Sequence, residues 1–181
     1  MTMLSSTAAF GGSREFKGNI TGVVTPTTID THADGHPASL TYSTTAEFLV
    51  QEMAENDREA GMACPLPDGS TGRLVVGQPI GGPGIFGWQL WHHRDSGSSL
   101  TIKTTKSETC MGESQSITRR AGEIVRGTGD FAGATGTLVQ ESNVNLLWGG
   151  KQAVQPYGAD PPYIGYFVSV DGEFELTVHT P

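Results

Sequence analysis

Short stretches in which apolar and polar residues alternate recur along most of the chain, and this pattern limits the possible folds more than any other feature. One stretch shows it clearly, because Leu40, Tyr42, Ala46, Phe48 and Val50 share one parity while Thr, Ser and Glu fill most of the other. Alternation with period two is typical of a strand with one buried face. Turn signals rich in Gly, Pro, Asn and Asp separate about eight such stretches.

Helices that could cover a sheet are nearly absent from the pattern. Only residues 51–61, rich in Glu, Ala and Met and ended by Gly61, predict a short helix. A sheet with one apolar face and no covering helices must close on itself or form a sandwich, and closure leaves no open edges. We therefore predict an all-β fold, an eight-stranded antiparallel β-barrel of the calycin type over residues 15–181. Residues 1–14 are expected to form a flexible tail or lid, and long loops are expected at the mouth, over 51–72 and 148–163.

The stretch GTGDFAGATGTL, residues 127–138, allows two interpretations. Its glycine spacing matches a phosphate-binding loop, but such a loop needs a helix after it, and the residues that follow have no helical period. The alternative is a tight corner between strands, in which Gly129, Gly133 and Gly136 supply positive φ angles or close backbone approach. We predict the corner, with Phe131 closing one end of the barrel. The D-G steps at 34–35 and 171–172 predict hairpin turns.

The same stretch resembles the G-x-G-x-F-x-G-A-T-G signature of the allene oxide cyclase and dirigent protein superfamily. The preceding ITRRAGEIVRG (117–127) is similar to the strand that leads into the signature, and YFVSVDGEFELTV (166–178) to the closing hairpin. The resemblance implies an eight-stranded antiparallel barrel with the glycines in a turn between two late strands. It also implies an enzyme or a dirigent protein that controls cyclisation or coupling. Because the chain shows no secretory signal, the bacterial spirotetronate-type cyclases are the nearest branch. No catalytic residue is carried over from the plant members.

Charge and composition exclude some partners. The net charge is −8 and the isoelectric point is about 5.0, so binding to nucleic acid is not expected. No apolar run is long enough to span a membrane as a helix. Cys64 and Cys110 stand alone in the sequence, and we expect two free thiols in a cytoplasmic protein, with a single disulfide as the alternative.

No metal ion or cofactor is expected. His32 and His36 lie near Asp30 and Asp34, but this group sits in a turn and lacks the later glutamate of a calcium loop. A hydrophobic small molecule is the expected partner, and the protein is expected to be a monomer, a homodimer or a homotrimer.

Successive side chains of a strand point to opposite faces, so odd or even residue numbers predict which residues line the barrel. We take the more apolar face of each strand as the interior, which gives a ring-lined cavity. The residues expected to donate hydrogen bonds to a substrate, as catalytic groups, are Trp88, Tyr166 and Tyr42. Those expected to bind the substrate are Phe48, Phe86, Leu90, Leu100, Ile102, Ile164 and Val168.

These features favour a cofactor-independent cyclase or isomerase of secondary metabolism. Such an enzyme would fold a hydrophobic, polyketide-like substrate for an intramolecular reaction such as a [4+2] cycloaddition, because orientation alone can supply roughly 7–11 kcal/mol. The alternatives are a barrel that binds a hydrophobic ligand without catalysis, in the manner of a lipocalin, and a dirigent-like protein with a filled interior.

Overall fold

The described part of the chain consists of strands and one short 3₁₀ helix. The computed structural model describes residues 11–24, 39–53, 56–79, 84, 86–112, 115–148 and 167–181. The strands are β1 (Gly12–Val24), β2 (Ser39–Thr44), β3 (Phe48–Met53), β4 (Asn56–Pro65), β5 (Thr71–Gln78), β6 (Gly87–His93), β7 (Ser99–Met111), β8 (Gln115–Gly127), β9 (Thr135–Trp148) and β10 (Phe167–Thr180), and η1 (Gly129–Phe131) precedes β9. Residues 12–14, which the sequence assigned to a tail, therefore lie in β1.

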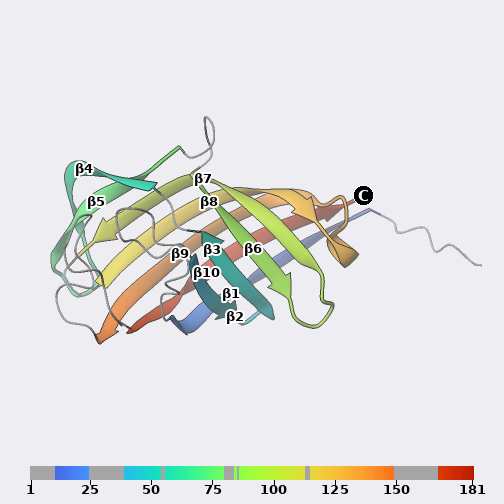
Figure 1. The fold of residues 1–181 in the computed structure, drawn as a ribbon, viewed down its shortest axis with the longest axis horizontal. Coiled ribbons are helices and arrows are strands. Elements are labelled where there is room, and N and C mark those ends of the chain that lie inside the picture. Colours follow the sequence, from blue (N-terminus) through green and yellow to red (C-terminus); the bar gives the residue numbers. More distant parts are fainter. Residues whose placement is uncertain are drawn as a thin grey trace, which may run out of the picture.

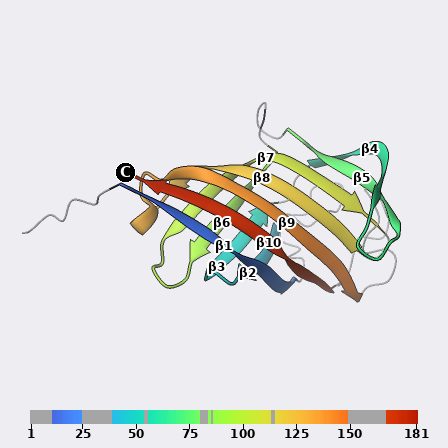
Figure 2. The ribbon, with the colours of Figure 1, turned by 180° about the vertical axis from the view of Figure 1, so that it is seen from behind.

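Eight of the strands close into an antiparallel barrel, as predicted. The order around the ring is β7-β6-β3-β2-β1-β10-β9-β8, and pairing of β8 with β7 completes it. Long tilted strands form one wall, and the shorter β2, β3 and β6 form the facing wall (Figures 1 and 2). At one end lie η1 and the chain's C-terminus, and we call it the η1 end. The opposite end carries the β4–β5 hairpin and is called the hairpin end.

The helix predicted over residues 51–61 is wrong. Residues 51–53 complete β3, and β4 begins at Asn56. Leu49 pairs with His92 and Glu52 with Gln89, so β3 is held between two neighbours along its length. Tertiary pairing of this kind overrides the weak helix preference of Glu and Ala.

The β4–β5 hairpin extends the barrel at the hairpin end. The first half of β7 pairs with β6, and its last residues pair with β5 instead. Only Arg73–Val76 of β5 pair with β7, so this hairpin is attached through a short ladder.

Residues 127–138 form the predicted corner. They end β8, pass through η1 and start β9, and no α-helix follows. Gly129, Gly133 and Gly136 have φ angles of 58°, 74° and 148°. A side chain at Gly127 would overlap the backbone carbonyl oxygen of Phe131. The glycines are therefore required by the backbone of the corner, as the second interpretation predicts, and the stretch is not a phosphate-binding loop.

The hairpin predicted at Asp171–Gly172 is wrong, because β10 runs without a turn from Phe167 to Thr180 and pairs with β1 and β9. Gly172 has a φ of 158°, and a Cβ there would overlap the carbonyl oxygen of Glu141 on β9. This glycine allows a close approach of two strands rather than a turn. The other D-G step lies outside the described residues.

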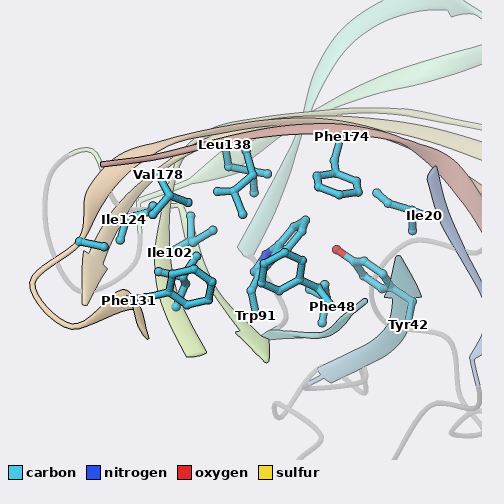
Figure 3. Packing of buried hydrophobic residues seen from close by; sticks show 14 of the residues in the cluster. Ile20, Tyr42, Phe48, Trp91, Ile102, Ile124, Phe131, Leu138, Phe174 and Val178 are labelled. Carbon is cyan, nitrogen blue, oxygen red and sulfur yellow. The ribbon is translucent and has the colours of Figure 1, made fainter. Parts of the chain in front are cut away.

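Aromatic rings fill the η1 end of the barrel. Phe131 is buried there, as predicted, and its ring lies about 6.2 Å from those of Phe16 and Phe48 and 6.1 Å from that of His93. Trp91 and Phe174 continue the core toward the middle, with ring centroids 5.1 Å apart (Figure 3). The η1 half is thus closed by packed side chains.

A disulfide joins Cys64 of β4 to Cys110 of β7, so the expectation of two free thiols is wrong. The bond crosses β5 at Gly72, where a Cβ would lie 2.9 Å from the Cys110 Sγ. The two cysteines are 46 residues apart, and only the fold brings them together. The expected cytoplasmic location rested on free thiols, and the disulfide removes that basis, because such bonds persist mainly in oxidising compartments.

We expect the variant with Cys64→Ser and Cys110→Ser to lose roughly 2–4 kcal/mol of unfolding free energy, because the bond closes a long loop and fastens a weakly attached hairpin. Denaturant unfolding measures the loss, and amide exchange should quicken first in β4. A reductant should destabilise the wild type by a similar amount and leave the variant unchanged. Equal stability of the two proteins without reductant would contradict the role of the bond.

Candidate functional site

The barrel interior changes from apolar to polar along its axis. From the η1 end, the inward residues of β9 are Leu138, Gln140 and Ser142, and all three are buried. In the register of β8 and β9, Leu138 pairs with Gly122, Gln140 with Arg120, and Ser142 with Thr118. A charged and polar layer therefore lies across the middle of the barrel.

Five side chains from four strands form a hydrogen-bonded network in this layer. The Tyr42 hydroxyl donates to the Glu52 carboxylate. Gln140 Nε2 lies 2.8 Å from the Tyr42 oxygen and 3.2 Å from Glu52 Oε1. Gln89 Nε2 lies 3.1 Å from Glu52 Oε1 and 3.2 Å from Gln140 Oε1. Trp91 Nε1 donates to Gln89 Oε1 over 2.7 Å. We call these five residues the polar network.

The charge of Glu52 is balanced by Arg120 of β8. Its Nη1 lies 3.4 Å from Glu52 Oε2, and the two side chains are only 14% and 6% exposed. By contrast, the exposed pair Arg119–Glu141 lies on the outer face of the same two-strand ladder, with side chains 64% and 50% exposed. A buried carboxylate that accepts several donors and faces a guanidinium is the arrangement expected of an ionised pair.

Tyr42 is held in its protonated form. Burial, and then the neighbouring Glu52 carboxylate, raise the pKa of Tyr42 well above its ordinary value of 10.0. The phenol hydroxyl is therefore a hydrogen-bond donor at neutral pH, and the Glu52 carboxylate accepts its bond.

Small hydroxyl side chains follow the polar network toward the hairpin end. Ser107 and Thr109 of β7, Thr118 of β8 and Ser142 of β9 are buried. The Thr109 and Thr118 hydroxyls lie 3.0 Å apart. We call these four residues the hydroxyl layer. Together with the polar network, they place buried polar side chains along the barrel interior from its middle toward the hairpin end.

Four of the residues predicted to line the interior are buried in it. Tyr42 is 3% exposed, and Phe48, Leu100 and Ile102 are fully buried. Tyr42 belongs to the polar network, whereas the other three belong to the apolar core nearer the η1 end. In Figure 3 the Tyr42 hydroxyl points toward the middle of the cluster.

The face assigned to β6 is wrong. Gln89 and Trp91 point inward and are buried, while Leu90 is 43% exposed and Trp88 shares its outward parity. The rule that the more apolar face is the interior fails here, because the polar network needs Gln89 inside. Trp91 therefore replaces Trp88 as the interior indole.

The remaining predicted residues are not brought together by the described structure. Tyr166 and Ile164 lie outside the described residues, as does the side chain of Val168. Phe86 is half-buried just before β6, and a Cβ on Gly77 would lie 3.3 Å from its ring.

Sequence reasoning missed most of the polar network. Glu52 shares the parity of Phe48 and Val50, but the helix predicted from residue 51 hid that signal. Gln140 and Arg120 lie on strands whose inward faces mix polar and apolar residues, so parity alone could not single them out.

Two further features bear on the kind of site. Among the described residues, no group of three or more His, Cys, Asp or Glu side chains is placed to hold a metal ion. The histidines and aspartates of residues 30–36 lie outside the described part. Within the described chain, no helix is long and apolar enough to cross a membrane.

These observations define a closed β-barrel with a buried, charged and hydrogen-bonded centre. A comparison with protein families finds no match, and a comparison with curated proteins finds none either. Among solved structures, a pterocarpan synthase dirigent protein aligns over 99% of this chain and 96% of its own, with 15% identity and a TM-score of 0.32. At that level of similarity no argument rests on the likeness, and the barrel is established by the strand pairing alone.

Proposed function

We propose that this protein is a cofactor-independent cyclase or isomerase that binds a hydrophobic, polyketide-like small molecule inside the barrel. The observation that carries the proposal is the polar network together with the buried ion pair between Glu52 and Arg120. A barrel core that served stability alone would gain little from a buried ion pair, because desolvation offsets much of the attraction. Buried ionisable groups that are held in fixed geometry are common at functional sites.

The roles follow from the chemistry of each group. Arg120, whose guanidinium carries N–H donors, would hydrogen-bond a substrate carbonyl and polarise it. Tyr42 would act as a donor, and Glu52 as the group that accepts or returns a proton. The hydroxyl layer would hold the polar end of the substrate, while its apolar part would contact the barrel wall.

Two reaction classes fit these roles. A cycloaddition needs a substrate held in one reactive conformation with its carbonyl polarised, and it needs no proton transfer. An isomerisation would move a proton: Tyr42 takes one from a substrate carbon while its own proton passes to Glu52, and the same pair returns a proton to another carbon. The alternative function is a barrel that binds a hydrophobic ligand without catalysis, and it is favoured by the fact that the members of the polar network satisfy one another.

The test incubates purified protein with a linear polyketide that carries a conjugated diene and an alkene conjugated to a carbonyl. We expect cyclised or isomerised product to form faster than in buffer. Glu52→Gln keeps the shape of the side chain and removes its ability to take a proton. Cyclisation should survive this change, and isomerisation should fall by roughly 10²–10⁴-fold.

Glu141→Gln, on the exposed pair, is the matched control and should change neither rate. Saturable binding without product would replace the enzyme with the binding barrel. If no such compound binds and no product forms, both functions are refuted.

A further inference from the structure

Two serine hydroxyls of the hydroxyl layer are buried without a partner. Ser107 of β7 and Ser142 of β9 are only 4% and 3% exposed. Within the described part of the chain, neither side chain has a hydrogen bond to another protein group. Most buried polar atoms in proteins are hydrogen-bonded, and one that is not indicates water or a ligand at that place. The polar network differs, because its members hydrogen-bond to one another.

Strand pairing places the four residues of the hydroxyl layer at neighbouring positions of one face. Ser142 pairs with Thr118 of β8, and Thr118 pairs with Thr109 of β7. Ser107 lies two residues before Thr109 on β7 and pairs with Arg120. Paired residues of antiparallel strands point to the same face, so the four hydroxyls line one continuous part of the barrel wall beside the polar network.

Each of the two serines has a glycine beside it on the next strand. Ser142 pairs with Gly172 of β10, which has no side chain to cover the hydroxyl. On the β5 side of Ser107, a Cβ at Gly77 would lie 3.1 Å from the Ser107 Cβ and 3.3 Å from the ring of Phe86. Small residues therefore flank both hydroxyls, and the Phe86 ring beside Ser107 is an apolar surface next to them.

The chemistry of the hydroxyl layer favours a neutral partner. The Thr109 and Thr118 hydroxyls lie 3.0 Å apart, and this bond uses one of the four hydroxyl protons of the layer, so three remain for a ligand. None of the four residues carries a charge, and the charge of the neighbouring Arg120 is balanced by Glu52. Burying an ionised group against hydroxyls alone is costly, whereas a neutral oxygen loses less hydration and gains hydrogen bonds.

We propose that the hydroxyl layer is the subsite for a neutral, oxygen-bearing end group of the ligand, a hydroxyl or a ketone, and that Ser107 and Ser142 determine this specificity. A carboxylate end is disfavoured because its charge would be buried, and a methyl end leaves both serines without partners. The inference rests on the proposed function for the presence of a hydrophobic small molecule in the barrel, and it names the end group of that molecule.

The test measures, by titration calorimetry at pH 7, the dissociation constants of three linear conjugated dienes of equal length that end in a hydroxyl, a carboxylate or a methyl group. We expect the alcohol to bind at least about tenfold more tightly than the other two. Ser142→Ala and Ser107→Ala should each weaken binding of the alcohol roughly three- to tenfold, because one hydrogen bond is lost, and should not weaken binding of the methyl compound. Ser169→Ala, on the outer face of β10, is the matched control and should change none of the constants.

The comparison of the three compounds on the unaltered protein needs no variant, so it decides the matter even where a substitution impairs folding. Equal affinities, tighter binding of the carboxylate, or no binding of any of the three would overturn the proposal. An unchanged affinity for the alcohol in either folded serine variant would also overturn it, and ordered water would then account for the buried hydroxyl.

This measurement follows binding and not product. A protein that shows the expected preference but forms no product would refute the proposed enzyme and leave the subsite intact. An enzyme that converts the polyketide but binds the three dienes alike would keep the proposed function and lose the subsite.

Discussion

Replacing Arg120 with Met is expected to lower the unfolding free energy by about 3–5 kcal/mol, since it leaves the Glu52 carboxylate buried without its cation. The expectation depends on burial: the two side chains are 14% and 6% exposed, and Nη1 lies 3.4 Å from Glu52 Oε2. The methionine fills a similar length of side chain, so the lost charge dominates the effect. Chemical denaturation at pH 7 measures it.

The neighbouring exposed pair provides the control. Arg119 Nε lies 2.6 Å from Glu141 Oε2, a shorter contact, yet both side chains are at least half exposed. Arg119→Met should therefore cost less than about 1 kcal/mol. Adding Glu52→Gln to Arg120→Met should restore part of the loss, because no uncompensated charge remains. Equal losses of unfolding free energy in Arg119→Met and Arg120→Met would show that the interior pair is not shielded from water.

Gly127→Ala is expected to destabilise the barrel by about 3 kcal/mol or more, at or beyond the upper end for overpacked sites. A Cβ at this position would overlap the carbonyl oxygen of Phe131, and both partners are tied to the backbone of the corner. The methyl group cannot be accommodated by a rotamer change. Relief requires movement of η1 and of the Phe131 ring that closes this end of the barrel.

Gly69 gives the comparison. Its φ is 82°, and nothing lies within 4 Å of a Cβ built there. Gly69→Ala therefore tests conformational strain without a clash, and it should cost about 1–2 kcal/mol. Thermal unfolding of the two variants separates the two effects. If Gly127→Ala proves no worse than Gly69→Ala, close packing is not the reason for glycine at position 127.

The closed barrel and its corner could be read from the chain because both depend on local signals. Alternation with period two predicts strands with one apolar face. Because helix formers are scarce, the sheet buries that face by closing on itself. Gly129, Gly133 and Gly136 have the positive φ angles expected of glycines in a corner, and Phe131 is the one aromatic residue of residues 127–138. Tyr42 and Phe48 were placed correctly because the apolar face of their strands is also the inner face.

The centre of the barrel could not be read in the same way. Parity divides a strand into two faces but does not tell which one is inside, and hydrophobicity chose the wrong face of β6. Gln89 points inward because Glu52, Gln140 and Trp91, from three strands, satisfy its amide. No single stretch of the sequence contains all the partners of the Gln89 amide.

The sequence by itself determined the class of fold, the corner and one closed end, because these follow from periodicity and from the φ angles that only glycine adopts easily. Tertiary structure alone decided the Cys64–Cys110 bond and the polar network around Glu52. Each joins residues from strands far apart in the chain, and burying a charge or a polar group is tolerable only where such partners meet.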